Sequence, residues 1–66
     1  MEVIINQEVF NIQNDSLIEA LRIYGLQETS GIAIAVNDHV IPKSSWNSFQ
    51  VHPQDNIIII RAAQGG

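Results

Sequence analysis

The sequence predicts an α+β domain in which a mixed sheet of four to five strands carries a single helix packed on one face. Three observations predict this fold. Strand-like segments precede and follow one stretch of helical periodicity. That stretch opens with a helix N-terminal signal. The last strand-like segment is a run of four isoleucines, Ile57 to Ile60, which favours a central strand covered largely on both faces.

Two strands joined by a tight turn are predicted at the start of the chain. Residues 1–5 and 8–12 each carry aliphatic side chains in a strand-like pattern. Asn6 begins the predicted turn between them, because Asn tolerates positive φ. We expect either Val9 or Phe10 of the second strand to point toward the core.

A helix is predicted over residues 16–24. Ser16 and Glu19 fit a capping box, in which each side chain satisfies the free backbone N–H of the other residue. Gly25 stands where a left-handed C-terminal cap belongs. The apolar residues between these signals follow helical spacing and form one stripe: Leu17, Ala20, Leu21 and Tyr24.

The remaining strands are predicted at residues 32–36, 40–41 and 57–60. A turn at residues 37–38 separates the first two of them, and Pro42 ends the second. A compact loop with one helical turn around Trp46 follows, and Trp46 is expected to anchor that loop. This order of elements, with the last strand central and parallel to the first, is the β-grasp arrangement.

One face of the predicted sheet is left without a helix. Neighbouring strand residues point to opposite faces, so if Ile57 and Ile59 face the helix, the residues beside them face away. The residues expected on this open face are Ile4, Ala33, Ala35, Ile58 and Ile60. Contiguous exposed apolar surface usually marks an interaction site, so we predict that partners dock here. The alternatives are pairing of two copies of the chain or an exchange of the two strand faces.

Length, charge and composition exclude several classes of protein. The 66 residues suffice for a single domain, residues 1–66, with little room for an enclosed active site. The net charge of −4 argues against nucleic-acid binding. Without cysteine there is no disulfide and no thiol nucleophile. Since neither a membrane-spanning apolar run nor a signal-peptide pattern is present, we expect a cytoplasmic protein.

No metal site is expected. The side chains of Asp38, His39, His52 and Asp55 have a spacing that matches no ligand pattern. Both histidines lie near predicted turns and should face solvent. Arg61 either pairs with an acidic partner or is a solvated strand end.

The chain ends with two glycines. Because glycine has no Cβ, Gly65 and Gly66 can thread a narrow channel, and the terminal carbonyl carbon is unhindered toward attack. Residues 62–66 can extend to about 16 Å. They carry no large apolar side chain, so a flexible tail is expected, with NMR order parameters below about 0.6 from Gln64 onward. The alternative is a frayed end without chemistry.

Three features of the sequence occur together. The first is the predicted helix with its capping box at Ser16 and Glu19. The second is the stretch Val36-Asn37-Asp38-His39-Val40-Ile41-Pro42-Lys43, which is followed by Trp46. The third is the ending Ala62-Ala63-Gln64-Gly65-Gly66. Their combination resembles a known family, the ubiquitin-like sulfur carrier proteins of thiamine biosynthesis (ThiS family). The resemblance extends over the full length of the chain.

The resemblance implies a covalent carrier rather than a catalyst. In that family an E1-like adenylyltransferase of the ThiF type adenylates the terminal glycine with ATP. The adenylate is converted to a thiocarboxylate, which donates sulfur to a thiazole synthase of the ThiG type. Carried over to this sequence, Gly66 is the modified residue, and Gly65 and Gln64 give it access. The chain itself would bind no cofactor, and the activating enzyme would supply ATP and magnesium.

Three other functions stay open. The small subunit of molybdopterin synthase shares the fold and the Gly-Gly ending, but it usually runs longer and lacks the Pro-basic-x-x-Trp segment. A ubiquitin-like binding module would use only the open face. Protein conjugation would join Gly66 to another protein. In each case we expect a monomer when the chain is free.

Overall fold

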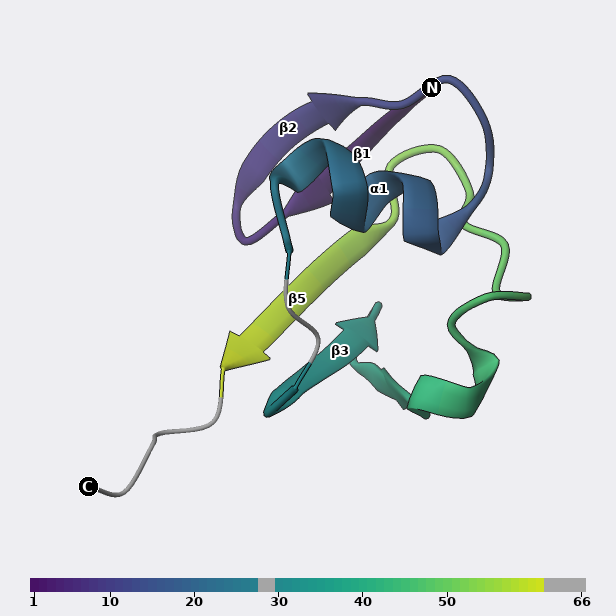
Figure 1. Cartoon of the computed structure of the whole chain (residues 1–66). Helices are drawn as coiled ribbons and strands as arrows, with labels where there is room; N and C mark the ends of the chain where they lie inside the picture. The colour runs from purple at the N-terminus through teal and green to yellow at the C-terminus, as the bar shows by residue number, and fades with distance from the viewer. Residues whose placement is uncertain (28–29, 62–66) are drawn as a thin grey trace.

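The structure, a computed structural model, describes residues 1–27 and 30–61 (Figure 1). Its strands are β1 (Glu2–Ile5), β2 (Glu8–Asn11), β3 (Ile32–Val36), β4 (His39–Ile41) and β5 (Asn56–Arg61). Helix α1 spans Leu17–Tyr24, and the 3-10 helix η1 spans Lys43–Ser45. Each predicted strand and the predicted helix is confirmed to within one residue at either end. The helical turn expected around Trp46 lies just before it.

The five strands form one sheet in the order β2-β1-β5-β3-β4. Strand β5 lies in the middle, parallel to β1 and antiparallel to β3. The prediction of a central last strand parallel to the first is therefore confirmed. Strand β5 has neighbours on both sides over its first residues and on the β3 side thereafter. The expectation that this strand is covered largely on both faces is wrong, because Ile60 is 53% exposed.

Both hairpins turn on two residues with positive φ. Asn6 and Gln7 have φ of 50° and 71°, and Asn37 and Asp38 have φ of 50° and 70°. Such turns match the right-handed twist of the flanking strands, and Asn is favoured in them because its side chain tolerates this conformation. Since each loop has only two residues, it also fixes which residues of the paired strands lie opposite one another.

The start of α1 confirms one half of the expected capping box and corrects the other. Ser16 Oγ accepts a hydrogen bond from the backbone N–H of Glu19 at 3.2 Å, as expected. The reciprocal contact is absent, because the N–H of Ser16 donates to Asn14 Oδ1 at 3.0 Å. An Asn two residues earlier can close this local turn, so the carboxylate of Glu19 is left to pair with Arg22 at 2.8 Å. Gly25, with φ of 103°, forms the predicted left-handed cap.

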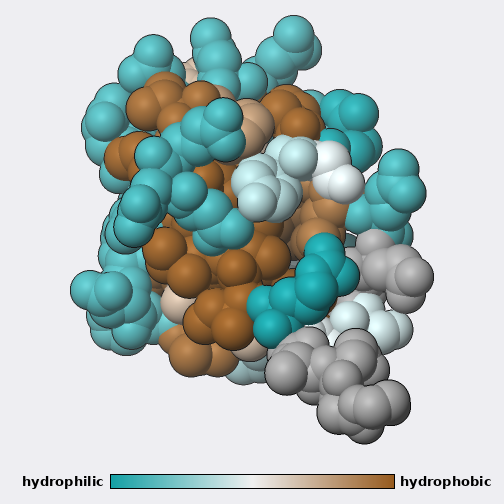
Figure 2. Space-filling model, turned by 90° about the vertical axis from the view of Figure 1, so that its left-hand side faces the viewer, coloured by the Kyte–Doolittle hydropathy of each residue, from teal (hydrophilic) through white to brown (hydrophobic). Residues whose placement is uncertain are grey.

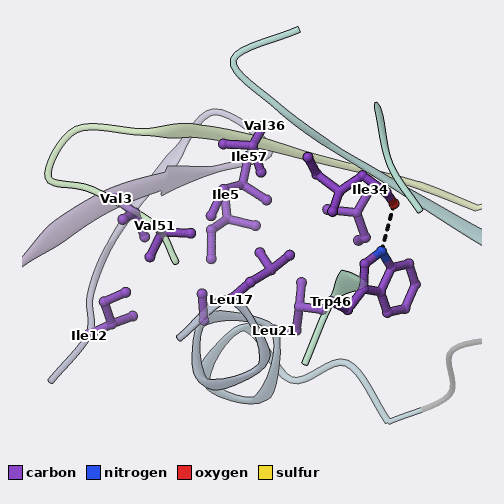
Figure 3. Close-up of a cluster of buried hydrophobic side chains, with 12 residues drawn as sticks. Val3, Ile5, Ile12, Leu17, Leu21, Ile34, Val36, Trp46, Val51 and Ile57 are labelled. Atoms are coloured by element: carbon purple, nitrogen blue, oxygen red, sulfur yellow. Dashed lines mark hydrogen bonds between the residues drawn. The ribbon is translucent and has the colours of Figure 1, made fainter. Parts of the chain in front are cut away.

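The core lies between α1 and one face of the sheet (Figure 3). The sheet contributes Val3, Ile5, Ile34, Val36, Ile41 and Ile57, and the helix contributes Leu17, Ala20 and Leu21. Phe10 packs against this cluster while Val9 is 61% exposed, which settles the alternative that the sequence left open. Trp46 is buried, and its Nε1 donates to the carbonyl of Ile41 at 2.8 Å (Figure 3). The expectation that it anchors the loop after Pro42 is confirmed.

The buried carboxylate of Asp55 accepts hydrogen bonds from two loops at the end of the sheet where β5 begins. Asp55 is 8% exposed, and its Oδ1 accepts from Asn37 Nδ2 at 2.9 Å. Its Oδ2 accepts from the backbone N–H of His52 at 2.7 Å. Asn37 Oδ1 in turn accepts from the backbone N–H of Asn56 at 2.9 Å. The β3–β4 turn is thereby joined to the first residue of β5.

Replacing Asp55 by alanine is expected to lower the free energy of unfolding by about 1–3 kcal/mol, because it leaves the Asn37 amide and the His52 N–H without their acceptor. Urea denaturation followed by circular dichroism measures the change. The matched control is Asp15→Ala, which removes an exposed carboxylate and should change the stability by no more than about 0.5 kcal/mol. Equal stability of the two variants would show that the buried carboxylate does not hold these loops.

Candidate functional site

The residues expected on the open face all lie on the side of the sheet that faces away from α1. Ala33 is paired with Ile60 and Ala35 with Ile58, between β3 and β5. Ile57, the neighbour of Ile58, is fully buried on the opposite side. Ile60 is 53% exposed, and Ile58 is half-buried. Ile4 is also half-buried and lies on the same side, because Val3 and Ile5 both enter the core.

Two further residues belong to this face and were missed from the sequence. Val9 of β2 lies opposite Ile4, and Val40 of β4 lies opposite Ala35. Their side chains are 61% and 71% exposed. A signal for both was present, since a two-residue turn after Ile5 places Ile4 opposite Val9, and the turn after Val36 places Ala35 opposite Val40.

With these two residues added, the open apolar face includes residues from all five strands. We define it by the residues Ile4, Val9, Ala33, Ala35, Val40, Ile58 and Ile60. Among the described strand residues on this side of the sheet, only Glu2 is charged, and it lies opposite Asn11 at one end. The surface therefore loses few solvated charges when it is covered, and a partner with an apolar contact surface fits it.

Apolar side chains also reach the surface at the end of the molecule where β5 ends. Figure 2 shows this side, with an apolar area through the middle and lower part of the view and polar side chains around it. The strand that carries Ile58 and Ile60 continues directly to Arg61, the last described residue. Arg61 is exposed, as both of its interpretations require.

The predicted reactive end lies outside the described residues. Gln64, Gly65 and Gly66, together with the rest of the expected tail, follow Arg61 in the sequence. The strand that precedes this end is described up to Arg61. The last residue pairs of the β3–β5 ladder are Ala33 with Ile60 and Ile32 with Arg61. The open apolar face and the predicted tail are therefore joined by a single strand.

The four residues weighed as metal ligands, Asp38, His39, His52 and Asp55, do not form a group that could hold a metal ion in the described part of the chain. His39 and His52 are both exposed, as predicted. His39 Nδ1 lies 3.1 Å from the carbonyl of Asn37, whereas His52 Nδ1 lies 3.8 Å from Asp55 Oδ2. Within residues 1–27 and 30–61 there is no group of three or more His, Asp or Glu side chains that could hold a metal ion.

No helix in the described part of the chain has both the length and the apolar character needed to cross a membrane.

A mixed sheet with its last strand in the centre and a helix on one face defines this chain as a ubiquitin-like, β-grasp protein. The model of the ThiS family matches residues 3–66. The chain therefore belongs to the ThiS family, the sulfur carrier proteins of thiamine biosynthesis, whose partners are enzymes of that pathway.

Comparison with solved structures agrees with the fold. The crystal structure of the thiamine biosynthesis protein (ThiS) from Geobacter metallireducens is similar to this chain, with a TM-score of 0.81 and 14% sequence identity. The match covers 100% of both chains. At this identity the likeness shows the β-grasp fold. A comparison with curated protein sequences gives no match.

Proposed function

We propose that this chain carries sulfur for thiazole formation as a thiocarboxylate on Gly66. The observation that carries the proposal is the family match, which runs from Val3 to Gly66 and so includes the Gly-Gly ending. The chain acts as a protein co-substrate in the cytoplasm, and the enzymes that modify it supply the catalytic groups.

The chemistry proceeds in two steps at the Gly66 carboxyl group. A carboxylate is a poor acyl donor because it has no good leaving group. An E1-like adenylyltransferase of the ThiF type therefore lets a Gly66 carboxylate oxygen attack the α-phosphorus of ATP, and pyrophosphate leaves. Sulfide-level sulfur (HS⁻ or its equivalent) then attacks the acyl carbon of the adenylate, AMP leaves, and loss of a proton gives the thiocarboxylate. ATP and magnesium are bound by that enzyme.

The composition of the chain suits this role. It has no cysteine, so no internal thiol can capture the activated acyl group. The two terminal glycines place no side chain beside the reacting carbon. A thiazole synthase of the ThiG type then transfers the sulfur to its substrate, and an oxygen atom from that substrate or from water takes its place, which regenerates the Gly66 carboxylate.

The open apolar face is the proposed docking surface for the activating enzyme. Two observations support this. Among the described strand residues on this side of the sheet, only Glu2 is charged. The face also includes residues of β5, the strand that leads to the predicted tail. Burial of Ile58 and Ile60 against a partner contributes about 3–6 kcal/mol before the costs of association. A partner that binds β5 in this way fixes the strand that immediately precedes residues 62–66.

Intact-mass spectrometry tests the proposed function. The chain is incubated with a ThiF-type enzyme, ATP, magnesium and a sulfur donor, and we expect a mass gain equal to the exchange of one oxygen for sulfur. Addition of a thiazole synthase with its substrates should return the original mass. No sulfur gain, or delivery only to the large subunit of molybdopterin synthase, would contradict the proposal. A covalent adduct with another protein would show conjugation instead.

A further inference from the structure

Strand β5 extends beyond the strand that pairs with it on one side. The β1–β5 ladder consists of two residue pairs, Ile4 with Asn56 and Ile5 with Ile57. On the other side, β3 is paired with β5 from Ile57 through Arg61. Within the described residues, the second half of β5 therefore has a strand neighbour only on the β3 side, and Figure 1 shows it projecting past the β1–β2 hairpin.

The hydrogen-bond pattern identifies the backbone groups on the unpaired side. The N–H of Asn6 donates to the carbonyl of Ile57 at 2.9 Å, so the polar groups of Ile57 point toward β1. Every second residue of a strand directs its N–H and C=O to the same side, which assigns Ile59 and Arg61 to the β1 side as well. The groups of Ile58 and Ile60 point toward β3 and belong to that ladder.

Among the described residues, side chains of the domain bond to one of the backbone groups on this side, the N–H of Ile59. Asn6 Oδ1 accepts from the N–H of Ile59 at 2.8 Å, and Asn6 Nδ2 donates to the hydroxyl of Tyr24 at 3.1 Å. The Asn6 side chain thus takes the place of a strand residue at the point where β1 has turned away. Among the described residues, the Ile59 carbonyl and the Arg61 N–H have no hydrogen-bond partner.

We propose that an extended backbone segment of the activating enzyme adds to this edge of β5, donating to the Ile59 carbonyl and accepting from the Arg61 N–H. This inference rests on the proposed function. Addition of a strand to a free sheet edge is a common mode of peptide recognition, in which backbone hydrogen bonds fix the register. A partner docked over Ile58 and Ile60 lies beside this edge already, and the bonds set the position from which residues 62–66 leave the domain.

The short length of the edge argues against a second copy of the chain as its occupant. The unpaired stretch covers Ile59 to Arg61, and a pairing of so few residues is marginal in water without other contacts. The activating enzyme supplies those contacts through the open apolar face. A second copy would instead give concentration-dependent dimers in sedimentation experiments, and that result would overturn the assignment.

Two substitutions at Arg61 separate its backbone from its side chain. Arg61→Pro removes the N–H, which no ladder between the described strands uses, whereas Arg61→Ala removes the guanidinium and keeps the N–H. We expect Arg61→Pro to raise the Kd for the activating enzyme, measured by calorimetry without ATP, roughly three- to tenfold more than Arg61→Ala does. Equal Kd values for the two variants would overturn the proposal.

A second variant excludes an effect of the proline ring. An ester in place of the amide between Ile60 and Arg61, introduced by chemical ligation, deletes the same N–H without a ring and should raise the Kd by a similar factor. In the wild-type complex the Arg61 amide should exchange its hydrogen more slowly than in the free protein, and unchanged exchange would contradict the proposal.

Mass spectrometry keeps the two proposals distinguishable. Normal affinity and normal sulfur loading of the ester variant would refute the edge contact and leave the proposed function intact. Weakened binding of that variant together with no sulfur loading of the wild-type chain would support the edge contact and refute the proposed function.

Discussion

Deletion of Gly66 is expected to abolish adenylation and thiocarboxylate formation while leaving the fold unchanged. The reason is positional: the carboxylate of a chain that ends at Gly65 stands one residue, about 3.3–3.6 Å, short of the reacting position. A displacement far smaller than this is enough to cost a large factor in rate. The fold should survive, because the buried core of the described part extends no further along the chain than Ile57.

The measurement is intact-mass spectrometry after incubation with the activating enzyme, ATP and a sulfur donor. A chain with one additional residue after Gly66 is the matched control, since it keeps both glycines and moves the carboxylate in the opposite direction. Both variants should show the thermal unfolding curve of the wild type and no gain of sulfur. If the shortened chain still exchanges an oxygen for sulfur, Gly66 is not the modified residue.

The adjacent residues Ile57 and Ile58 should respond in opposite ways to the same substitution. Ile57 is fully buried, so Ile57→Glu places a carboxylate in the core without a partner and costs about 3–5 kcal/mol or more. A domain of this size has modest stability, so this variant should be unfolded at room temperature. Ile58 is half-buried on the open apolar face, and Ile58→Glu should cost the free domain about 1 kcal/mol.

The effect of Ile58→Glu should appear in binding instead. A charged side chain at the centre of an apolar contact must be desolvated, so we expect the Kd for the activating enzyme to rise roughly 30-fold or more. Circular dichroism and calorimetry on the same two variants separate stability from affinity. The reverse result, with Ile58→Glu unfolded and Ile57→Glu tolerated, would mean that the two faces are exchanged. Normal binding of Ile58→Glu would show that the partner docks elsewhere.

The local elements could be predicted because their causes lie close together in the sequence. Ser16 bonds to an N–H three residues ahead, and Gly25 adopts a conformation that other residues avoid. The two Asn-initiated turns work in the same way. Alternation then assigned Ile57 and Ile58 to opposite faces, because the period of a strand is two residues regardless of what lies around it.

The open apolar face was predicted only in part. Its β1, β3 and β5 residues follow from alternation, but Val9 and Val40 require the pairing across each hairpin as well. The second half of the capping box was wrong for a different and local reason. The side chains of Asn14 and Glu19 both carry an oxygen that can accept from the N–H of Ser16. Asn14 Oδ1 accepts this hydrogen bond, because Asn14 is only two residues away in the sequence.

The sequence by itself determined the secondary-structure elements, the two-residue turns and which residues of each strand face the core. It also carried the family motifs at residues 36–46 and 62–66. Only the tertiary structure decided which polar groups meet across long distances in the chain. Asn37 and Asp55 are 18 residues apart, and Asn6 reaches the N–H of Ile59 across 53 residues. Such contacts depend on strand order and register, which place backbone ends side by side, and no local pattern encodes them. The unpaired edge at Ile59 and Arg61 is of the same kind, because it exists only where β1 stops and β5 continues.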